Sequence, residues 1–420
     1  MQSLYDAAMR IAKALLHVVW KVCPERFLSH DSKTYQFIAG QEDILQAIGR
    51  EMADNQRDVY WVHASSLGEY GVARPILKRL QAEGRCVVLT FFSPTGYLAL
   101  HGKRDTGADH IFYLPWDTRR NARQFLDILK PRRAVFIISE YWMNYLTELG
   151  QRQIPTFMVS ALVPKDTYLK RWYAGPIRRA LKAITTFMVL NKESQQTLAS
   201  MGFHNSTVMG DPLFDNALSI AQTPYQNSIV ERFCQSTDGV FIAGSISDKN
   251  DLELVSHLAN SQPETKFIFV PHEISEHSLL AIKASLHGQS VNYSACTPDT
   301  DFSQVQVLVI NYVGDLSRIY RYGRWAYVGG GFTPLLHSVI EPTVYGLPVA
   351  FGPRIERKTT PRQMSSLGIG RVVETGQELQ AWFLQLKDNR QLRESISRKA
   401  LDYAQSQAGA TDAIVNTIIR

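Results

Sequence analysis

The sequence has few cysteines, no long apolar run and none of the common nucleotide-binding glycine motifs. Its four cysteines lie far apart with no CxxC pair, which argues against a zinc site or a dense disulfide framework and fits a reducing cytosol. No run reaches about 18 apolar residues, and no apolar leader with a small-residue cleavage site is present, so we expect neither a spanning helix nor a secretory signal. The absence of GxGxxG and GxxxxGKS disfavours NAD-dependent oxidoreductases and P-loop NTPases.

The composition is that of a folded, basic protein. Hydrophobic residues make up 45% of the 420 residues and charged residues 20%, with 26 Gly and 18 Pro, which excludes collagen-like, low-complexity and wholly disordered chains. This length exceeds what one hydrophobic core organises and predicts two or three domains. The net charge of +6 favours anionic partners such as nucleotides, phosphorylated lipids or a membrane surface.

The N-terminal residues have the pattern of an amphipathic helix. Apolar residues recur at helical spacing, and a largely basic stripe lies between them. The apolar positions are Leu4, Ala8, Ile11, Leu15, Val18 and Val22. The stripe consists of Asp6, Arg10, Lys13, His17 and Lys21. Such a helix either lies in the interface of an anionic membrane leaflet or packs as a surface helix on its own domain, and the pattern allows both.

Short β-rich apolar runs alternate with helical patterns along the rest of the chain, which is typical of parallel sheets covered by helices. The first set of predicted strands is 59–63, 86–92, 134–139, 156–161, 187–191 and 207–210. The second set is 239–244, 266–270, 306–311, 326–329, 347–351 and 371–373. Between the sets, residues 211–226 hold Pro212 and Pro224, and the alternation weakens. We therefore predict an α/β chain with two doubly wound, Rossmann-like domains facing a central cleft.

The predicted organisation has four parts. Residues 1–25 form the amphipathic helix, 26–215 the N-terminal domain and 216–388 the C-terminal domain. Residues 389–420 form a helical segment that packs back across the hinge. Ligands of open α/β sheets bind beyond the carboxyl ends of the strands, so the loops that follow the strands should line the site.

Two carboxylates follow predicted strands of the first set. Glu69 ends the loop HASSLGE, in which a strand finishes near His63 and a helix begins. A general base would be well placed there, and the helix macrodipole equally favours an acid in a first turn without any catalytic role. Glu140 closely follows the apolar run 135–138, a place that suits either a catalytic carboxylate or an N-cap of the next helix.

A glycine-rich segment, VGGGFTPLLHSVIEP at 328–342, follows a strand of the second set. Its glycines allow a ligand to approach the backbone closely, and the next helix start offers amide groups for a phosphate. Glu341 is placed to accept hydrogen bonds from sugar hydroxyls, whereas His337 by itself favours a capping or core role. Two shorter loops belong to the same rim: VPHE at 270–273, and NYVGDL at 311–316 with Gly314 before another helix start.

Six motifs follow one another along the chain. They are HASSLGE at 63–69, YLPWD at 113–117, SEYW at 139–142, GDPLFD at 210–215, VGGGF at 328–332 and EPTVYGLPVAFGP at 341–353. With these motifs in this order, the chain resembles the 3-deoxy-D-manno-octulosonic acid (Kdo) transferases of lipopolysaccharide biosynthesis, a GT-B glycosyltransferase family. The ordered set spans most of the chain and is far more specific than any one motif.

This resemblance implies inverting transfer of Kdo from CMP-Kdo to the glucosamine disaccharide of a lipid A precursor, lipid IVA, without a metal or other cofactor and without a nucleic-acid partner. The expected enzyme is a lipid IVA Kdo transferase, held peripherally or monotopically on the cytoplasmic face of the bacterial inner membrane. Glu69 would be the general base and Glu140 the transition-state stabiliser. The residues implied in binding CMP are Pro271, His272, Val313, Gly314, Asp315, Ser338, Val339, Ile340 and Glu341.

Three basic residues of the N-terminal half, Arg74, Lys170 and Arg171, are candidate contacts for the phosphates of the acceptor, although solvated surface charge is their commoner role. Two positions depart from the family pattern. Leu213 stands where the family has a basic residue, so either a neighbour such as Lys192 substitutes for it or the activity is altered. The HN pair before the nucleotide-binding helix is His337-Ser338 here, and Ser caps a helix well.

Two other functions stay open on the sequence alone. One is a GT-B enzyme that uses another nucleotide sugar or another acceptor. The other is a catalytically silent homologue that binds nucleotide or lipid, for which Leu213 is the main support. The presence of both Glu69 and Glu140 argues against the silent homologue, because such a protein has no chemical need for both carboxylates.

Overall fold

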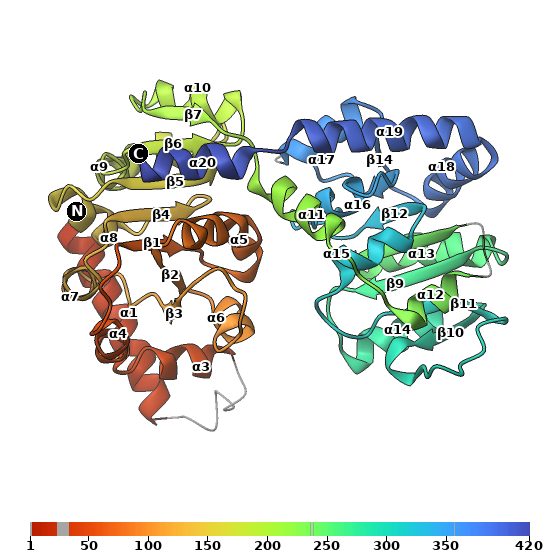
Figure 1. Ribbon diagram of the computed structural model, residues 1–420, viewed down its shortest axis with the longest axis horizontal. Coiled ribbons are helices and arrows are strands. Elements are labelled where there is room, and N and C mark those ends of the chain that lie inside the picture. The colour runs from red at the N-terminus through yellow and green to blue at the C-terminus, as the bar shows by residue number, and fades with distance from the viewer. Residues whose placement is uncertain (1, 23–32, 236, 238, 357) are drawn as a thin grey trace. The chain divides into compact units, whose positions relative to one another are not determined.

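The computed structural model describes residues 2–22, 33–235, 237, 239–356 and 358–420, which form two compact units (Figure 1). The first unit is Met1–Asn216 with Gly409–Arg420, and the second is Ala217–Ala408. The division after Asn216 falls within the segment 211–226, where the sequence alternation weakens. Met1 and residues 23–25 of the predicted segment 1–25 lie outside the described residues.

The first unit is built on a parallel seven-stranded sheet in the order β3-β2-β1-β4-β5-β6-β7. Its strands are β1 (Val59–His63), β2 (Cys86–Phe91), β3 (His110–Tyr113), β4 (Arg133–Ile137), β5 (Thr156–Ala161), β6 (Thr186–Val189) and β7 (Ser206–Val208). The helices are α1 (Gln2–Val22), α3 (Lys33–Gly40), α4 (Ile44–Met52), α5 (Leu67–Ala82), α6 (Pro94–Leu100), α7 (Arg119–Leu129), α8 (Met143–Gln151), α9 (Gly175–Leu181), α10 (Lys192–Ser200), the start of α11 (Pro212–Gln222) and α20 (Ala410–Ile419). Two 3₁₀ turns, η1 (Tyr168–Lys170) and η2 (Trp172–Ala174), precede α9.

The central strands of this sheet are mostly apolar because helices cover both of its faces. Every residue of β1 and of β2 is buried, and apolar clusters lie on the two sides of the sheet. On one side α7 buries Phe125 and Leu126, at the spacing that the sequence predicts. On the other side α20, the blue C-terminal helix in Figure 1, packs Ile414 and Ile418 into the core beside α5.

The second unit repeats this plan with the parallel sheet order β10-β11-β9-β8-β12-β13-β14. Its strands are β8 (Val240–Ile246), β9 (Lys266–Pro271), β10 (Gln289–Asn292), β11 (Val305–Val309), β12 (Trp325–Val328), β13 (Val349–Phe351) and β14 (Gly370–Val372). Its helices are the end of α11, α12 (Ser228–Cys234), α13 (Lys249–Ser261), α14 (Glu276–Ser285), α15 (Leu316–Ile319), α16 (Ile340–Thr343), α17 (Thr359–Ser366), α18 (Gly376–Asp388) and α19 (Arg390–Ser406), with 3₁₀ turns η3 (Tyr293–Ala295) and η4 (Tyr320–Tyr322). The predicted segment 389–420 is divided, because α19 belongs to this unit and α20 to the first.

Each sheet has one strand more than the six that the sequence predicts. The additional strands, β3 and β10, lie at one end of their sheets. β10 reads Gln-Ser-Val-Asn, with a mostly polar sequence that a strand paired on one side tolerates, so no apolar run marks it. β3 has four residues, and the first of them, His110, is polar and only partly buried.

Helix α1 contacts the rest of the first unit through a different face from the apolar stripe that the sequence predicts. The Tyr5 hydroxyl donates to Asp117 Oδ2 at 2.7 Å, and Asp6 Oδ1 accepts from the Arg119 N–H at 2.7 Å. The predicted apolar stripe points away from this contact: the exposed fractions of Leu4, Ile11, Leu15 and Val18 are 72%, 60%, 62% and 56%. Among the described residues, no helix is both long and apolar enough to span a bilayer.

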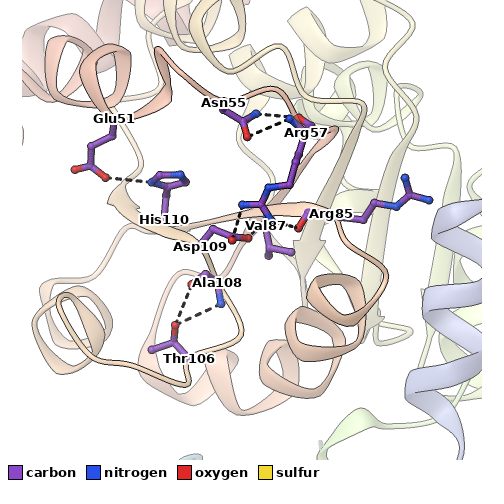
Figure 2. Close-up of polar contacts among 9 residues, drawn as sticks. All are labelled: Glu51, Asn55, Arg57, Arg85, Val87, Thr106, Ala108, Asp109 and His110. Atoms are coloured by element: carbon purple, nitrogen blue, oxygen red, sulfur yellow. Dashed lines mark hydrogen bonds and ion pairs between the residues drawn. The ribbon is translucent and has the colours of Figure 1, made fainter.

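The amino-terminal edge of the first sheet is fastened by a polar cluster that precedes β1, β2 and β3 (Figure 2). Asp109 accepts from Arg57 Nη2 at 2.7 Å and from the Val87 N–H at 2.8 Å, and Arg57 Nη1 donates to the Arg85 carbonyl at 3.2 Å. At the same edge His110 Nδ1 lies 3.2 Å from Glu51 Oε2. These contacts hold the amino-terminal ends of the strands, whereas ligands of such sheets bind at the carboxyl ends. We therefore assign the cluster a structural role.

We expect Asp109→Ala to lower the free energy of unfolding by about 1–3 kcal/mol, because the buried Val87 N–H then loses its side-chain acceptor. The change is measurable as a lower denaturant midpoint in circular dichroism. Asp54→Ala, at an exposed turn position, serves as the control and should stay within about 0.5 kcal/mol of the parent. Equal midpoints for Asp109→Ala and the parent would contradict a structural role for the cluster.

Candidate active site

In the first unit, the strand order changes direction between β1 and β4. The chain builds β2 and β3 on one side of β1, and then β4 to β7 on the other side. The loops that leave β1 and β4 therefore run in opposite directions and open a crevice at the carboxyl edge, the usual ligand position of doubly wound sheets. Glu69 follows β1 and Glu140 follows β4, so the topology brings the two predicted catalytic residues to one place.

The position of Glu69 follows from the way in which α5 begins. Ser66 is the N-cap, and its hydroxyl accepts from the Glu69 N–H at 3.4 Å. In return Glu69 Oε2 accepts from the Ser65 N–H at 2.5 Å, an arrangement close to a capping box. Helix capping alone therefore accounts for an acid at this position, and a catalytic Glu69 would have to exchange this hydrogen bond for one to a substrate.

Glu140 lies in the loop between β4 and α8, with a side chain that is 19% exposed. Burial raises its pKa, and the polar side chains of Ser65 and Trp142 oppose this shift. Burial, reinforced by the nearby Glu140 carboxylate and opposed by the Ser65 N–H, raises the pKa of Glu69 to about 7. Glu69 therefore loses its proton close to neutral pH.

The sequence analysis misses three residues of this site. His63 ends β1, fully buried, and its Nε2 lies 3.3 Å from Ser65 Oγ and 3.9 Å from Glu140 Oε2. Thr90, on the neighbouring strand β2, lies 2.9 Å from His63 Nδ1 through its Oγ1. The third residue, Ser65, connects His63 to Glu69, because its Oγ lies beside His63 Nε2 and its N–H donates to Glu69 Oε2. The motif HASS could have indicated His63 and Ser65, because these residues stand two positions apart at the end of a buried strand.

Leu213, where the family pattern has a basic residue, packs against the helix that bears Glu69. A Cβ atom added to Gly71 of α5 would lie 3.3 Å from Leu213 Cδ2, and Leu213 joins the apolar cluster on that side of the sheet. Lys192 is exposed as the first residue of α10. Its substitution for the missing basic group stays a prediction.

The three predicted acceptor contacts differ in their surroundings. Arg74 of α5 is engaged, because its Nη1 donates to Asn216 Oδ1 at 3.3 Å and its Nη2 lies 3.6 Å from Asp105 Oδ2. Lys170 and Arg171 are exposed in the η1–η2 segment, next to Trp172, whose side chain is 89% exposed. Sequence analysis does not single out Trp172, since an aromatic residue beside a basic pair is compatible with a core position.

The second unit has an equivalent crevice, between β8 and β12. Asp251, buried at the start of α13, accepts from the Ser247 N–H at 2.9 Å, from the Gly330 N–H at 2.8 Å and from the Tyr327 hydroxyl at 2.7 Å. It thereby joins the loop after β8 to the loop after β12. Glycine is required at Gly329, where an added Cβ would overlap the Ser245 carbonyl.

Two histidines meet at this edge. Pro271 ends β9, and the ring of His272 after it lies 4.3 Å from the ring of His337, centroid to centroid. His337 Nε2 is also 2.8 Å from Ser247 Oγ, so three loops of the carboxyl edge converge on it. Burial, followed by the charges of His272 and Lys358, lowers the pKa of His337 to about 4. The sequence analysis assigns His337 a capping or core role, and its placement beside His272 is information that only the fold supplies.

The remaining predicted donor residues lie after β11 and β12. Val313 is 83% exposed, Gly314 has φ of 122°, and Asp315 accepts from the Tyr225 hydroxyl and from Arg318, both at 3.0 Å. The helices that follow, α15 and α16, have only four residues each, so they are much shorter than the phosphate-binding helices that the sequence suggests.

The segment at 338–341 presents mainly its backbone and one carboxyl group. Val339 and Ile340 are buried in the core of the second unit, so any contact of these two with a nucleotide would be through the backbone. Burial raises the pKa of Glu341 to about 7. Across the described residues, no three His, Cys, Asp or Glu side chains are grouped so that they could hold a metal ion.

A family model and individual known proteins both resemble this chain in sequence. Residues 42–216 match the family model of 3-deoxy-D-manno-octulosonic-acid transferase (kdotransferase). The 3-deoxy-D-manno-octulosonic acid transferase of Bordetella pertussis is 26% identical over 367 residues, which cover 84% of each chain. That of Aquifex aeolicus is 25% identical over 321 residues, which cover 72% of this chain and 78% of the relative.

The chain is therefore similar to the 3-deoxy-D-manno-octulosonic acid (Kdo) transferases. Its fold is GT-B, with two Rossmann-like domains, as predicted. Similar solved structures include the UDP-GlcNAc 2-epimerase of Neisseria meningitidis, with a TM-score of 0.62 at 15% identity, covering 86% of this chain and 99% of the other. MurG of Acinetobacter baumannii has a TM-score of 0.52 at 14% identity with the same coverages. At these identities the likeness concerns the fold alone.

We expect Glu69→Gln to stabilise the protein increasingly as the pH rises. Folding raises the pKa of Glu69 from 4.5 to about 7, so the ionised carboxylate is penalised in the folded state. The penalty is absent below about pH 4.5 and complete above about pH 7, and the neutral Gln never incurs it. The Tm difference between variant and parent should therefore grow by a few °C between about pH 5 and pH 8 in thermal melts.

The matched control is Glu83→Gln, which replaces the residue that caps the other end of the same helix. Its Tm difference should stay constant over this pH range. A constant difference for Glu69→Gln as well would contradict the raised pKa.

Proposed function

We propose that this protein is a Kdo transferase, which transfers Kdo from CMP-Kdo to the glucosamine disaccharide of a lipid A precursor such as lipid IVA, with inversion and without a metal ion or cofactor. The observation that supports this most directly is the pair Glu69 and Glu140, held around Ser65 at the switch point of the first sheet. A carboxylate whose pKa is about 7 suits general base catalysis at neutral pH.

In this proposal Glu69 takes the proton of the acceptor hydroxyl as the oxygen attacks the anomeric carbon of Kdo. The bond between that carbon and the phosphate oxygen breaks, and CMP leaves with the bonding electron pair. Glu140 faces the positive charge that develops on the sugar and stabilises it. Because the pKa of Glu69 is about 7, this carboxyl group loses its proton near neutral pH. Only the form that has lost this proton can act as the base.

The donor would bind at the carboxyl edge of the second sheet. Here the backbone of the glycine segment allows close approach, and the side chains of Ser247, His272 and His337 converge. Lys358, whose charge lowers the pKa of His337, adds a cation to this edge. A phosphate that leaves with negative charge is stabilised by such donors and cations. Glu341 would accept hydrogen bonds from the ribose hydroxyls.

We further propose that the protein works on a membrane surface, at the cytoplasmic face of the inner membrane. The unpacked stripe of α1, with Leu4, Ile11 and Leu15, has the form of an interfacial helix, and Arg10 and Lys13 suit an anionic leaflet. The exposed Trp172 beside Lys170 and Arg171 has the composition of a second interfacial contact. Such a surface would let the enzyme reach a lipid acceptor without extracting it from the bilayer.

One observation favours a second candidate, a silent homologue that binds nucleotide or lipid. Leu213 places an apolar contact against α5, where the family pattern has a basic group that supports the transition state. A protein of this kind would bind CMP and membranes but would transfer no sugar. The assay below separates the two candidates.

We expect Glu69→Gln to reduce kcat for Kdo transfer by about 10² to 10⁴-fold, because it removes the general base. The assay combines purified protein, CMP-Kdo generated in situ and a tetraacylated lipid A precursor, with the lipid product followed by mass spectrometry. Glu83→Gln on the same helix should keep the activity of the parent.

CMP binding, measured by calorimetry, should be equal in all three proteins. Transfer by Glu69→Gln at the rate of the parent would refute Glu69 as the base. No transfer by the parent while CMP still binds would favour the silent homologue.

We expect Leu15→Glu to weaken binding to anionic vesicles about tenfold, because a charge enters the apolar stripe of α1. The measurement is flotation with phosphatidylglycerol-containing vesicles. Leu280→Glu, at an exposed leucine of α14 in the second unit, is the matched control and should bind as the parent does. Equal binding by Leu15→Glu and the parent would show that the stripe is not the membrane contact.

A further inference from the structure

Asp117 is a fully buried carboxylate that the proposed reaction does not use. It ends the motif YLPWD, which begins in β3. Its two oxygens accept three hydrogen bonds from two other parts of the chain. Oδ1 accepts from the Tyr145 N–H at 3.1 Å. Oδ2 accepts from the Asn144 N–H at 3.2 Å and from the Tyr5 hydroxyl at 2.7 Å. A buried carboxylate requires such donors, because they replace the hydration that burial removes.

Two of these donors belong to the first turn of α8. The N–H groups of Asn144 and Tyr145 lie where an α-helix supplies no partner from its own backbone. The first bond of the helix starts one residue later, from the Leu146 N–H to the Trp142 carbonyl. Trp142 is the N-cap and makes no side-chain cap hydrogen bond. Asp117 therefore caps α8 from a separate loop, and Asn144 Nδ2 returns a hydrogen bond to the Asp117 carbonyl at 2.6 Å.

The capped end of α8 holds the short loop 138–142, which bears Glu140 and joins β4 to α8. The loop begins at Ile138 with φ of 63°, a left-handed conformation that is strained for a β-branched residue. Strain of this kind persists only where the surrounding contacts fix the chain. On the β4 side, the Ile138 N–H and the Ser139 hydroxyl donate to carbonyl oxygens in β5 and just after it. On the α8 side, Asp117 is the anchor.

Trp142 connects the start of α8 to the site. Its ring lies 4.6 Å from the ring of Phe92 and 5.7 Å from the ring of His63, centroid to centroid. Glu140 Oε2 lies 3.9 Å from His63 Nε2. Trp142 and Glu140 thus stand beside the same histidine at the end of β1. A displacement of the start of α8 would therefore change the position of both side chains.

Tyr5 ties the N-terminal helix to the same carboxylate. It lies on α1, and α1 and α8 also contact each other. Burial raises the pKa of Asp117 to about 6, and the Tyr5 hydroxyl is the first of the donors that oppose this shift. Without this hydroxyl, Oδ2 would keep only the Asn144 N–H, so the ionised carboxylate would be held less firmly.

We propose that Asp117 is a positioning residue for Glu140, which caps α8 and thereby fixes the loop 138–142, and that Tyr5 links α1 to this anchor. The importance of Glu140 for catalysis rests on the proposed function. The anchor itself rests on contacts within the first unit. The N-terminal helix then has a role besides any membrane contact of its exposed stripe, because its packed face supports the geometry of the active-site loop.

The test removes the acceptor and the hydroxyl separately. Asp117→Asn turns one carboxylate oxygen into an NH₂ group, which donates and cannot accept from Tyr5 or from the amides of α8. Tyr5→Phe removes the hydroxyl alone. Asp109→Ala is the matched control, because we expect it to destabilise the same unit at the opposite edge of the sheet, away from α8 (Figure 2).

We expect kcat for Kdo transfer to fall about 10–100-fold in Asp117→Asn and about 3–10-fold in Tyr5→Phe, because a displacement of about 1 Å in a catalytic group can cost about 10²-fold. KM for CMP-Kdo should stay near that of the parent, since the donor is proposed to bind at the second unit. The acceptor is supplied in detergent micelles, so membrane binding by α1 does not limit the rate. Asp109→Ala, assayed well below its Tm, should keep the kcat of the parent.

A second readout needs no turnover. The indole ¹H–¹⁵N resonance of Trp142, one of seven tryptophans in the chain, reports on the position of the loop 138–142 and is assigned with Trp142→Phe. It should shift in Asp117→Asn and in Tyr5→Phe and stay in place in Asp109→Ala. A parent protein that transfers no Kdo would refute the proposed function and leave this test of the anchor intact.

If Asp117→Asn does not fold, Tyr5→Phe decides. A parent-like kcat and a parent-like indole resonance in Asp117→Asn would overturn the proposal. Equal changes in Asp109→Ala would also overturn it, since a merely structural role would not separate the two variants. Parent-like values in Tyr5→Phe would overturn the link to α1.

Discussion

The change of direction of the strand order in each parallel sheet is the constraint on which the rest of the structure depends. In the first unit it separates β1 from β4, and in the second it separates β8 from β12. At these two places alone, neighbouring strands send their loops apart, so backbone and side chains at the carboxyl edge are not covered by a crossover helix. Glu69 and Glu140 lie at the first opening, and Asp251 ties together the loops of the second.

Burial at these openings sets the protonation of the site more strongly than any ion pair does. It is the largest influence on His63, Glu69, Glu140 and His337, and in each case it disfavours the charged form. The pKa values of the carboxyl groups are thereby raised towards neutral pH, where a general base is most effective, and the imidazoles stay uncharged. The ends of the buried strands therefore both position these side chains and shift their pKa values.

Much of the fold and part of the site could be predicted from the sequence. Fully buried strands such as β1 and β2 read as mostly apolar runs, and the two carboxylates lie in the segments that follow β1 and β4. Thr90 could not be found in this way, because it is one polar residue inside an apolar strand and contacts His63 only through the strand register. His337 meets His272 across two loops that are 65 positions apart in the sequence. The packing face of α1 was also hidden, since it combines the hydrogen bonds of Tyr5 and Asp6 with apolar contacts of Met9 and Leu16, which lie outside the predicted stripe.

Leu213 is consistent with this electrostatic setting. Its side chain covers Gly71, two residues after Glu69, and adds apolar surface on the helix that bears the base. No cation is among the influences on the pKa of Glu69 from the described residues, which are burial, Glu140 and the Ser65 N–H. A basic side chain at position 213 would favour the ionised carboxylates and lower their pKa values. With an apolar residue at position 213, the hydrogen bond from the Ser65 N–H is the influence that favours the charged form of Glu69.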